Sequence, residues 1–106
     1  MELADDKKLR LLYRVEPGCL GPTGADTIER FCEYANQQIT PPYFAGYHFV
    51  PRFDKTKPER QYSINQKSLS EQQAQAYLGH FKTSIDVFEE QLDELLTEAI
   101  ERFLNR

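Results

Sequence analysis

The chain has 106 residues, the size of a single domain over residues 1–106, and this length leaves no room for a second independent core. Hydrophobic residues make up 40% of the sequence and charged residues 28%, a balance that excludes an intrinsically disordered chain. The formal net charge of −4 argues against a protein that binds nucleic acid through its overall electrostatic field.

The N-terminal segment is charged, and residues 1–8 are expected to be disordered. No apolar run approaches the roughly 20 residues that cross a bilayer, and no signal-peptide pattern is present, so we expect a cytoplasmic protein without a membrane segment. Cys19 and Cys32 are expected to be free thiols, because two cysteines in a chain without an export signal rarely form a disulfide. No metal site and no cofactor are expected.

Apolar and polar residues alternate over residues 9–16, which predicts a half-buried strand that ends at Pro17 and Gly18. A glycine-rich loop follows. Asp26 and Glu29 have the spacing of a capping box, so a helix is expected to begin there. Its apolar residues recur at helical spacing up to Ile39.

Residues 43–50 are dense in aromatic side chains and predict a second strand that is covered on both faces. Residues 51–59 are polar, and residues 60–67 alternate again. The two strands are therefore expected to pair with each other as an antiparallel hairpin with a long loop.

Beyond Ser70, which has the position of an N-cap, apolar residues step by alternating intervals of four and three residues to the C-terminus. An unbroken helix over residues 71–104 would be about 50 Å long at 1.5 Å per residue, which exceeds the diameter of a domain of this size. Either the helix breaks near Gly79–Ser84, or its second half projects and packs against another chain. Together these elements predict an α+β fold in the order β-α-β-β-α, with a small three-stranded mixed sheet packed by helices.

Three functional hypotheses follow from the residues. The first is a small non-catalytic interaction or regulatory module that forms homodimers through its C-terminal helix, because this helix has more apolar surface than a two-helix contact needs. The expected interface residues are Phe88, Leu92, Leu95, Leu96, Ala99, Ile100 and Phe103. The acidic residues of the same helix are interpreted as a solvated face.

The second hypothesis is single-stranded nucleic-acid binding by the hairpin over residues 43–62, where aromatic rings would stack on bases and basic side chains would pair with phosphates. The expected binding residues are Tyr47, Phe49, Arg52, Lys55, Lys57 and Arg60. The third is thiol chemistry at Cys19, because a thiol near a helix N-terminus can have a larger thiolate fraction. Neither His48 nor His80, the two available bases, lies near Cys19 in sequence.

Overall fold

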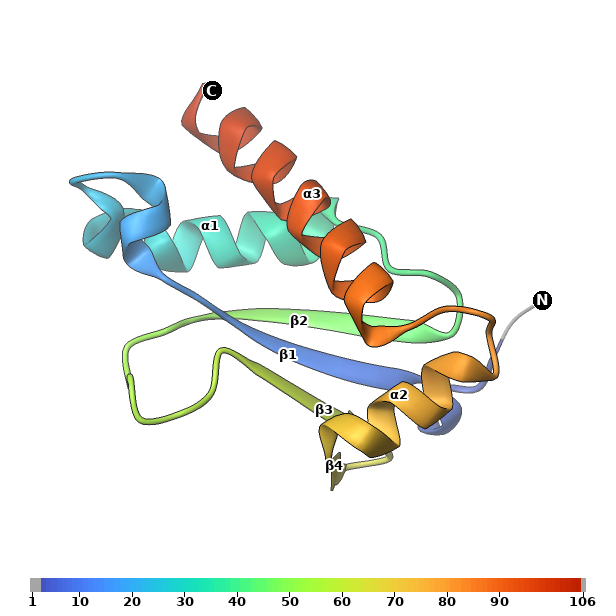
Figure 1. Ribbon diagram of the computed structural model, residues 1–106. Coiled ribbons are helices and arrows are strands. Elements are labelled where there is room, and N and C mark those ends of the chain that lie inside the picture. The colour runs from blue at the N-terminus through green and yellow to red at the C-terminus, as the bar shows by residue number, and fades with distance from the viewer. Residues whose placement is uncertain (1–2, 106) are drawn as a thin grey trace.

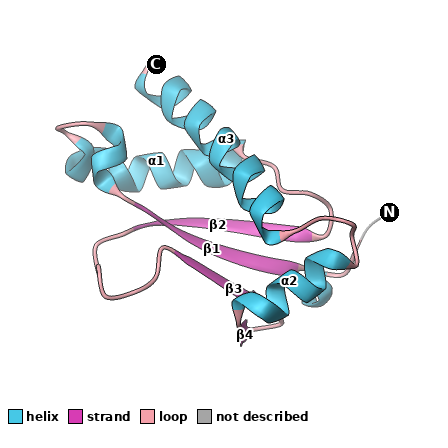
Figure 2. Ribbon diagram, viewed as in Figure 1, coloured by secondary structure: helices cyan, strands magenta, loops and turns pink. Residues whose placement is uncertain are grey.

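Four strands form one mixed sheet, and helices cover one of its two faces (Figures 1 and 2). The structure is a computed structural model that describes residues 3–105. Its elements are β1 (Leu9–Val15), α1 (Gly24–Gln38), β2 (Ala45–Pro51), β3 (Arg60–Ile64), β4 (Lys67–Leu69), α2 (Glu71–Gly79) and α3 (Ile85–Leu104), with short 3₁₀ helices η1 (Asp5–Lys7) and η2 (Pro17–Leu20). The α+β class expected from the sequence is confirmed.

The strand order is β2-β1-β3-β4, so β1 lies inside the sheet. β1 pairs in parallel with β2, which the chain reaches through α1, and it pairs antiparallel with β3 on its other side. The predicted hairpin between the second and third strands is therefore wrong. β1 buries alternate residues almost completely, from Leu9 to Val15, and a strand with such an apolar face gains most from a central position.

The predicted count of three strands is also wrong, because residues 60–69 form two strands instead of one. Asn65 and Gln66 have positive φ angles of 49° and 69°, and this two-residue turn folds β4 back onto β3. The usual sequence of such a two-residue turn is Asn-Gly. Gln66 in the glycine position made the turn hard to recognise in the sequence.

The first helix begins earlier than the predicted capping box. Thr23 is the N-cap residue of α1, and its side chain makes no capping hydrogen bond. Gly24, the first residue of α1, packs so closely on η2 that a Cβ atom there would lie 1.7 Å from the Pro17 carbonyl oxygen. The contact with η2 therefore fixes the start of α1.

The C-terminal helix is broken, as one of the two alternatives predicted. α2 has a full capping box made by Ser70 and Gln73, and it ends at Gly79. α3 begins at Ile85, where the Ser84 hydroxyl accepts a hydrogen bond from the Val87 amide. No helix within residues 3–105 combines the length and the apolar character that a membrane span requires.

The core lies between the sheet and the helices. Its largest fully buried side chains are Phe31, Phe49, Phe88, Leu9, Leu11, Ile28, Leu78, Leu92 and Val15. The Tyr77 hydroxyl on α2 lies within hydrogen-bond distance of the carbonyl oxygens of Lys7 and Phe44. This contact holds the segment that leads into β1 and contains η1. The disorder expected for residues 1–8 stays a prediction, and residues 1 and 2 of that range lie outside the described residues.

Candidate functional site

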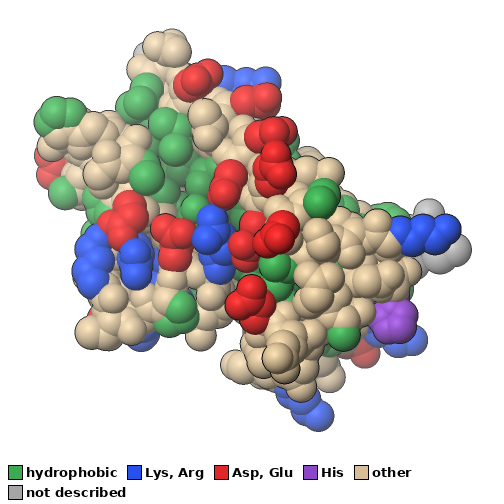
Figure 3. Space-filling model, viewed as in Figure 1, with side chains coloured by type: hydrophobic (Ala, Val, Ile, Leu, Met, Phe, Trp, Pro, Cys, Tyr) green, Lys and Arg blue, Asp and Glu red, His purple; other side chains and the backbone are tan. Residues whose placement is uncertain are grey.

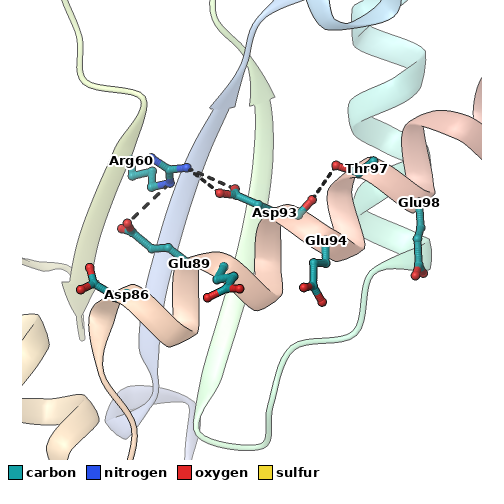
Figure 4. Close-up of a pocket in the computed structure, with 8 residues that line it drawn as sticks. Arg60, Asp86, Glu89, Asp93, Glu94, Thr97 and Glu98 are labelled. Atoms are coloured by element: carbon teal, nitrogen blue, oxygen red, sulfur yellow. Dashed lines mark hydrogen bonds and ion pairs between the residues drawn. The ribbon is translucent and has the colours of Figure 1, made fainter.

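A shallow acidic groove of about 710 Å³ runs along α3 beside β3. Figure 3 shows carboxylate side chains following the course of α3 across the surface, and Figure 4 shows the groove in close-up. The lining residues are Arg60, Asp86, Glu89, Glu90, Asp93, Glu94, Thr97 and Glu98. Six carboxylates thus face a single guanidinium, which makes the groove strongly negative at neutral pH.

The periodicity of α3 produces this acidic surface. The residues of α3 that pack into the core recur every three or four positions, and among them Phe88, Leu92 and Leu96 are buried. The positions between them face solvent or the groove, and most of these are Asp or Glu. A helix with this pattern must place its carboxylates together on the side away from the core.

Arg60 of β3 lines one end of the groove, beside Glu89 and Asp93. Its guanidinium lies 3.2 Å from an oxygen of Asp93 and 4.0 Å from one of Glu89, and it also lies over the ring of Tyr13 at 5.1 Å. Within residues 3–105 its Nε atom is buried without a hydrogen-bond partner. Arg60 therefore neutralises part of the charge at the start of the groove.

A second contact binds α3 to the sheet at the same place. The Tyr62 hydroxyl donates a hydrogen bond of 2.5 Å to the Glu89 carboxylate. Burial and this hydrogen bond raise the pKa of Tyr62 above its ordinary value, so the phenol stays protonated and remains a donor at neutral pH. Glu89 is thus occupied by structural contacts.

The remaining carboxylates of the groove are free to bind. Within the described part of the chain, Asp86, Glu90, Glu94 and Glu98 make no ion pair and accept no side-chain hydrogen bond. In Figure 4, Glu94 and Glu98 point away from Arg60. The described residues also contain no group of three His, Cys, Asp or Glu side chains placed to hold a metal ion.

The residues expected to bind nucleic acid do not form one exposed surface. Phe49 is 1% exposed and faces the helices, where Tyr47 contacts the ring of Phe88. Arg52 and Lys55 both bind the carboxylate of Glu16.

Most of the basic side chains expected to bind phosphate are held in ion pairs within the protein. The hydrogen bonds from Lys55 and Arg52 lower the pKa of the Glu16 carboxyl, and they fasten the loop over residues 52–59 to the end of β1. Arg60 is held in the acidic groove. Lys57 is exposed.

Most of the expected dimer interface lies inside the domain. Phe88, Leu92, Leu96 and Ala99 are buried by the chain's own sheet and helices. Phe103 packs edge-on against Phe31 of α1, with ring centroids 5.3 Å apart, and Ile100 is partly buried against the core. Leu95 is 37% exposed. Most of the apolar stripe of the C-terminal helix is thus covered by the domain itself.

Cys19 is exposed on η2, and no described hydrogen bond joins it to His48 or His80. His48 lies on β2 and His80 follows the end of α2. Cys32 is buried in α1, and burial raises the pKa of its thiol to about 12. Within residues 3–105, no described hydrogen bond links either thiol to a histidine.

The acidic groove was not identified as a site from the sequence, although its signal was visible. Eight acidic residues against three basic ones follow residue 69, and their spacing places many of them on one helical face. The contribution of Arg60 and Tyr62 depends on the position of β3 beside α3, which the sequence pattern does not give. No known family model matches the chain, and no curated protein or solved structure shows significant similarity to it.

Proposed function

We propose that this protein is a small, non-catalytic interaction module of the cytoplasm, and that the acidic face of α3 binds a positively charged segment of another protein. The observation that supports this proposal is the groove itself, in which six carboxylates face one guanidinium and four of the six have no ion-pair partner within residues 3–105. A basic segment would supply the missing counter-charges.

An apolar contact adds to the electrostatic one. Val87 is 45% exposed and lies on the solvent side of α3, between the carboxylates of its outer face. A partner helix that alternates Lys or Arg with Leu could cover Val87 while its charges reach the groove. A second copy of this chain fits less well here, because two acidic faces would repel each other.

Charge reversal in the groove tests this proposal. The ligand tested is a synthetic amphipathic helix that carries Lys and Leu at helical spacing, and its affinity is measured by fluorescence anisotropy at several salt concentrations. We expect the double variant Glu94→Lys, Glu98→Lys to bind at least about tenfold more weakly, because two attractive pairs become repulsive.

The matched control is the double variant Glu29→Lys, Glu33→Lys, which makes the same change of net charge on α1. We expect its affinity to stay within about twofold of the unmodified protein, because these residues lie outside the groove. Equal losses in the two double variants would mean that only net charge matters, and the proposed site on α3 would be wrong.

Self-association through α3 is a second candidate function. Leu95 and Leu104 are 37% and 53% exposed, and Leu95 lies on the flank of α3 that carries Gln91 and Arg102 in place of carboxylates. Two copies could cover Leu95 around a twofold axis. Leu104, nine residues further along α3, lies on the opposite side of the helix. Sedimentation velocity at rising concentration should then show a dimer that Leu95→Glu dissociates, and a strict monomer at high micromolar concentration would contradict it.

A further inference from the structure

The helices leave the second face of the sheet open, and a separate hollow of about 610 Å³ lies there at the β2 edge. Strand residues alternate between the two faces, and the register aligns Gly46, Arg10 and Ser63 across β2, β1 and β3. His48 and Leu12 form the next row. The residues that line the hollow on this side are Arg10, Leu12, Gly46, His48, Ser63 and Gln66.

Gly46 allows Arg10 to lie flat across the neighbouring strand. A Cβ atom at position 46 would lie 3.2 Å from a terminal nitrogen of Arg10 and 3.6 Å from its Cδ atom. The absent side chain therefore leaves the space that the guanidinium occupies. This contact places the guanidinium of Arg10, with its five N–H donors, at the wall of the hollow, where the side chain remains half exposed.

The charge of this hollow is opposite to that of the groove on α3. No carboxylate lines it, although the protein has 17 Asp and Glu residues. The side chains of His48, Ser63 and Gln66 make no hydrogen bond to another described residue. Four polar groups that can donate hydrogen bonds thus surround one cavity.

One acidic residue competes for Arg10 from outside. An oxygen of Asp5 lies 4.0 Å from Arg10 and 3.5 Å from the Lys8 ammonium, and the Asp5 side chain is 81% exposed. At this distance and exposure the ion pair is weak. An incoming oxyanion could replace Asp5 at small cost.

We propose that this hollow binds the oxyanion group, phosphate or carboxylate, of a small molecule. Arg10 forms the charged pair, because a guanidinium fork matches both groups in geometry. His48, Ser63 and Gln66 donate further hydrogen bonds, and Leu12 contacts the apolar part of the ligand. The volume of the hollow lies within the range of small-molecule sites.

A nucleic acid fits this face less well than a small molecule. Bases of a single strand would need exposed rings to stack on. Tyr47 lines the hollow, but its ring packs against the rings of Phe49 and Phe88. The rings of Tyr13, Phe49 and Tyr62 lie on the opposite, helix-covered face. The proposed ligand is therefore not a polynucleotide.

The experiment is a titration of the ¹⁵N-labelled protein with inorganic phosphate and, separately, with acetate, at constant ionic strength. We expect saturable shifts of the amide signals of Arg10, His48 and Ser63, and the tighter of the two anions identifies the group. Arg10→Ala should weaken binding about tenfold, the effect of losing one charge-assisted pair. Asp5→Asn should strengthen binding, because it removes the competing carboxylate.

Two further variants exclude trivial explanations. Gly46→Val keeps Arg10 but fills the space beneath it, so we expect the same loss as in Arg10→Ala, with an unchanged circular dichroism spectrum. Arg102→Ala makes the same change of net charge on α3, and its affinity should match that of the unmodified protein. Signal shifts that grow linearly without saturation would overturn the proposal, as would a loss of affinity in Arg102→Ala equal to that in Arg10→Ala. An oligothymidylate that binds through these residues more tightly than either anion would overturn it as well.

Discussion

The side-chain amide of Asn36 occupies the outer edge of the sheet. Its oxygen accepts a hydrogen bond of 2.8 Å from the Phe49 amide, and its nitrogen donates one of 3.0 Å to the Phe49 carbonyl. β2 is an edge strand, and such a strand offers unpaired backbone groups to other chains. Asn36 takes the place that a fifth strand would have at Phe49.

Replacing Asn36 by alanine should therefore lower the stability of the fold. Both backbone groups of Phe49 lose their partner, and we expect the free energy of unfolding to fall by about 1–2 kcal/mol. Urea denaturation followed by circular dichroism measures this change. Gln37→Ala, one residue further along α1 at an exposed position, should change it by less than about 0.5 kcal/mol. Equal effects of the two substitutions would contradict the role of Asn36.

The two cysteines should differ sharply in reactivity. With a pKa of about 12, fewer than about one Cys32 thiol in a thousand is ionised at pH 8, and burial also blocks access to it. We expect iodoacetamide at pH 8 to alkylate exposed Cys19 and to spare Cys32 in the folded protein, as read by peptide mass spectrometry.

The same reaction tests thiol chemistry at Cys19. No described hydrogen bond joins the exposed Cys19 thiol to a base, so its alkylation rate should equal that of a cysteine in a short peptide. Denaturant should make both cysteines react, which is the control for the protection of Cys32. A Cys19 rate at least tenfold above the peptide rate would instead support the thiol hypothesis.

At the level of elements, local sequence patterns predicted the individual strands and helices, whereas the predicted strand pairing was wrong. The alternation in residues 9–15 and the helical spacing that ends at Ile39 identified β1 and α1, and the N-cap at Ser70 identified the start of α2. Strand pairing was predicted from adjacency in the chain. The sheet instead places β1 between β2 and β3, because burial of its apolar face outweighs the shorter connection.

The close contact between η2 and α1 makes Gly24 a sensitive position. A Cβ atom there would overlap the backbone of Pro17, and neither backbone can move without disturbing the start of α1. We expect Gly24→Ala to reduce the free energy of unfolding by about 3 kcal/mol.

Gly18 provides the matched control for this substitution. It lies in η2, its φ angle is negative, and a Cβ atom there would have no neighbour within 4 Å. Gly18→Ala should be neutral or slightly stabilising, because alanine narrows the unfolded ensemble. Thermal denaturation of the two variants gives the comparison, and a Gly24→Ala protein as stable as Gly18→Ala would show that α1 can shift.

Across the whole molecule, the acidic groove and the guanidinium of Arg10 lie on different surfaces. The carboxylates of α3 follow the helix, whereas Arg10 and His48 lie on the open face of the sheet. The sequence predicted the acidic side of α3 but not what lies beside it. The groove needs Arg60 of β3 beside α3, and the hollow needs Gly46 under Arg10, so both sites depend on contacts between segments far apart in the chain.

Repulsion between the carboxylates of α3 should lower the free energy of unfolding. Glu90, Glu94 and Glu98 follow one another at intervals of four residues, and like charges at this spacing destabilise a helix by a few tenths of a kcal/mol per pair. We expect the triple variant Glu90→Gln, Glu94→Gln, Glu98→Gln to be more stable in urea at low salt by about 0.5 kcal/mol. The gain should disappear at about 0.5 M NaCl, where the Debye length is shorter than the distance between these charges.

The same triple variant separates a binding surface from a merely solvated one. Surfaces that serve binding often reduce stability, and removing their charges then raises stability while it lowers affinity. We therefore expect the variant to lose affinity for the basic helix in the same solutions in which it gains stability. A variant that gains stability and still binds would show that the carboxylates of α3 only interact with water, and the interaction surface would have to lie elsewhere on the molecule.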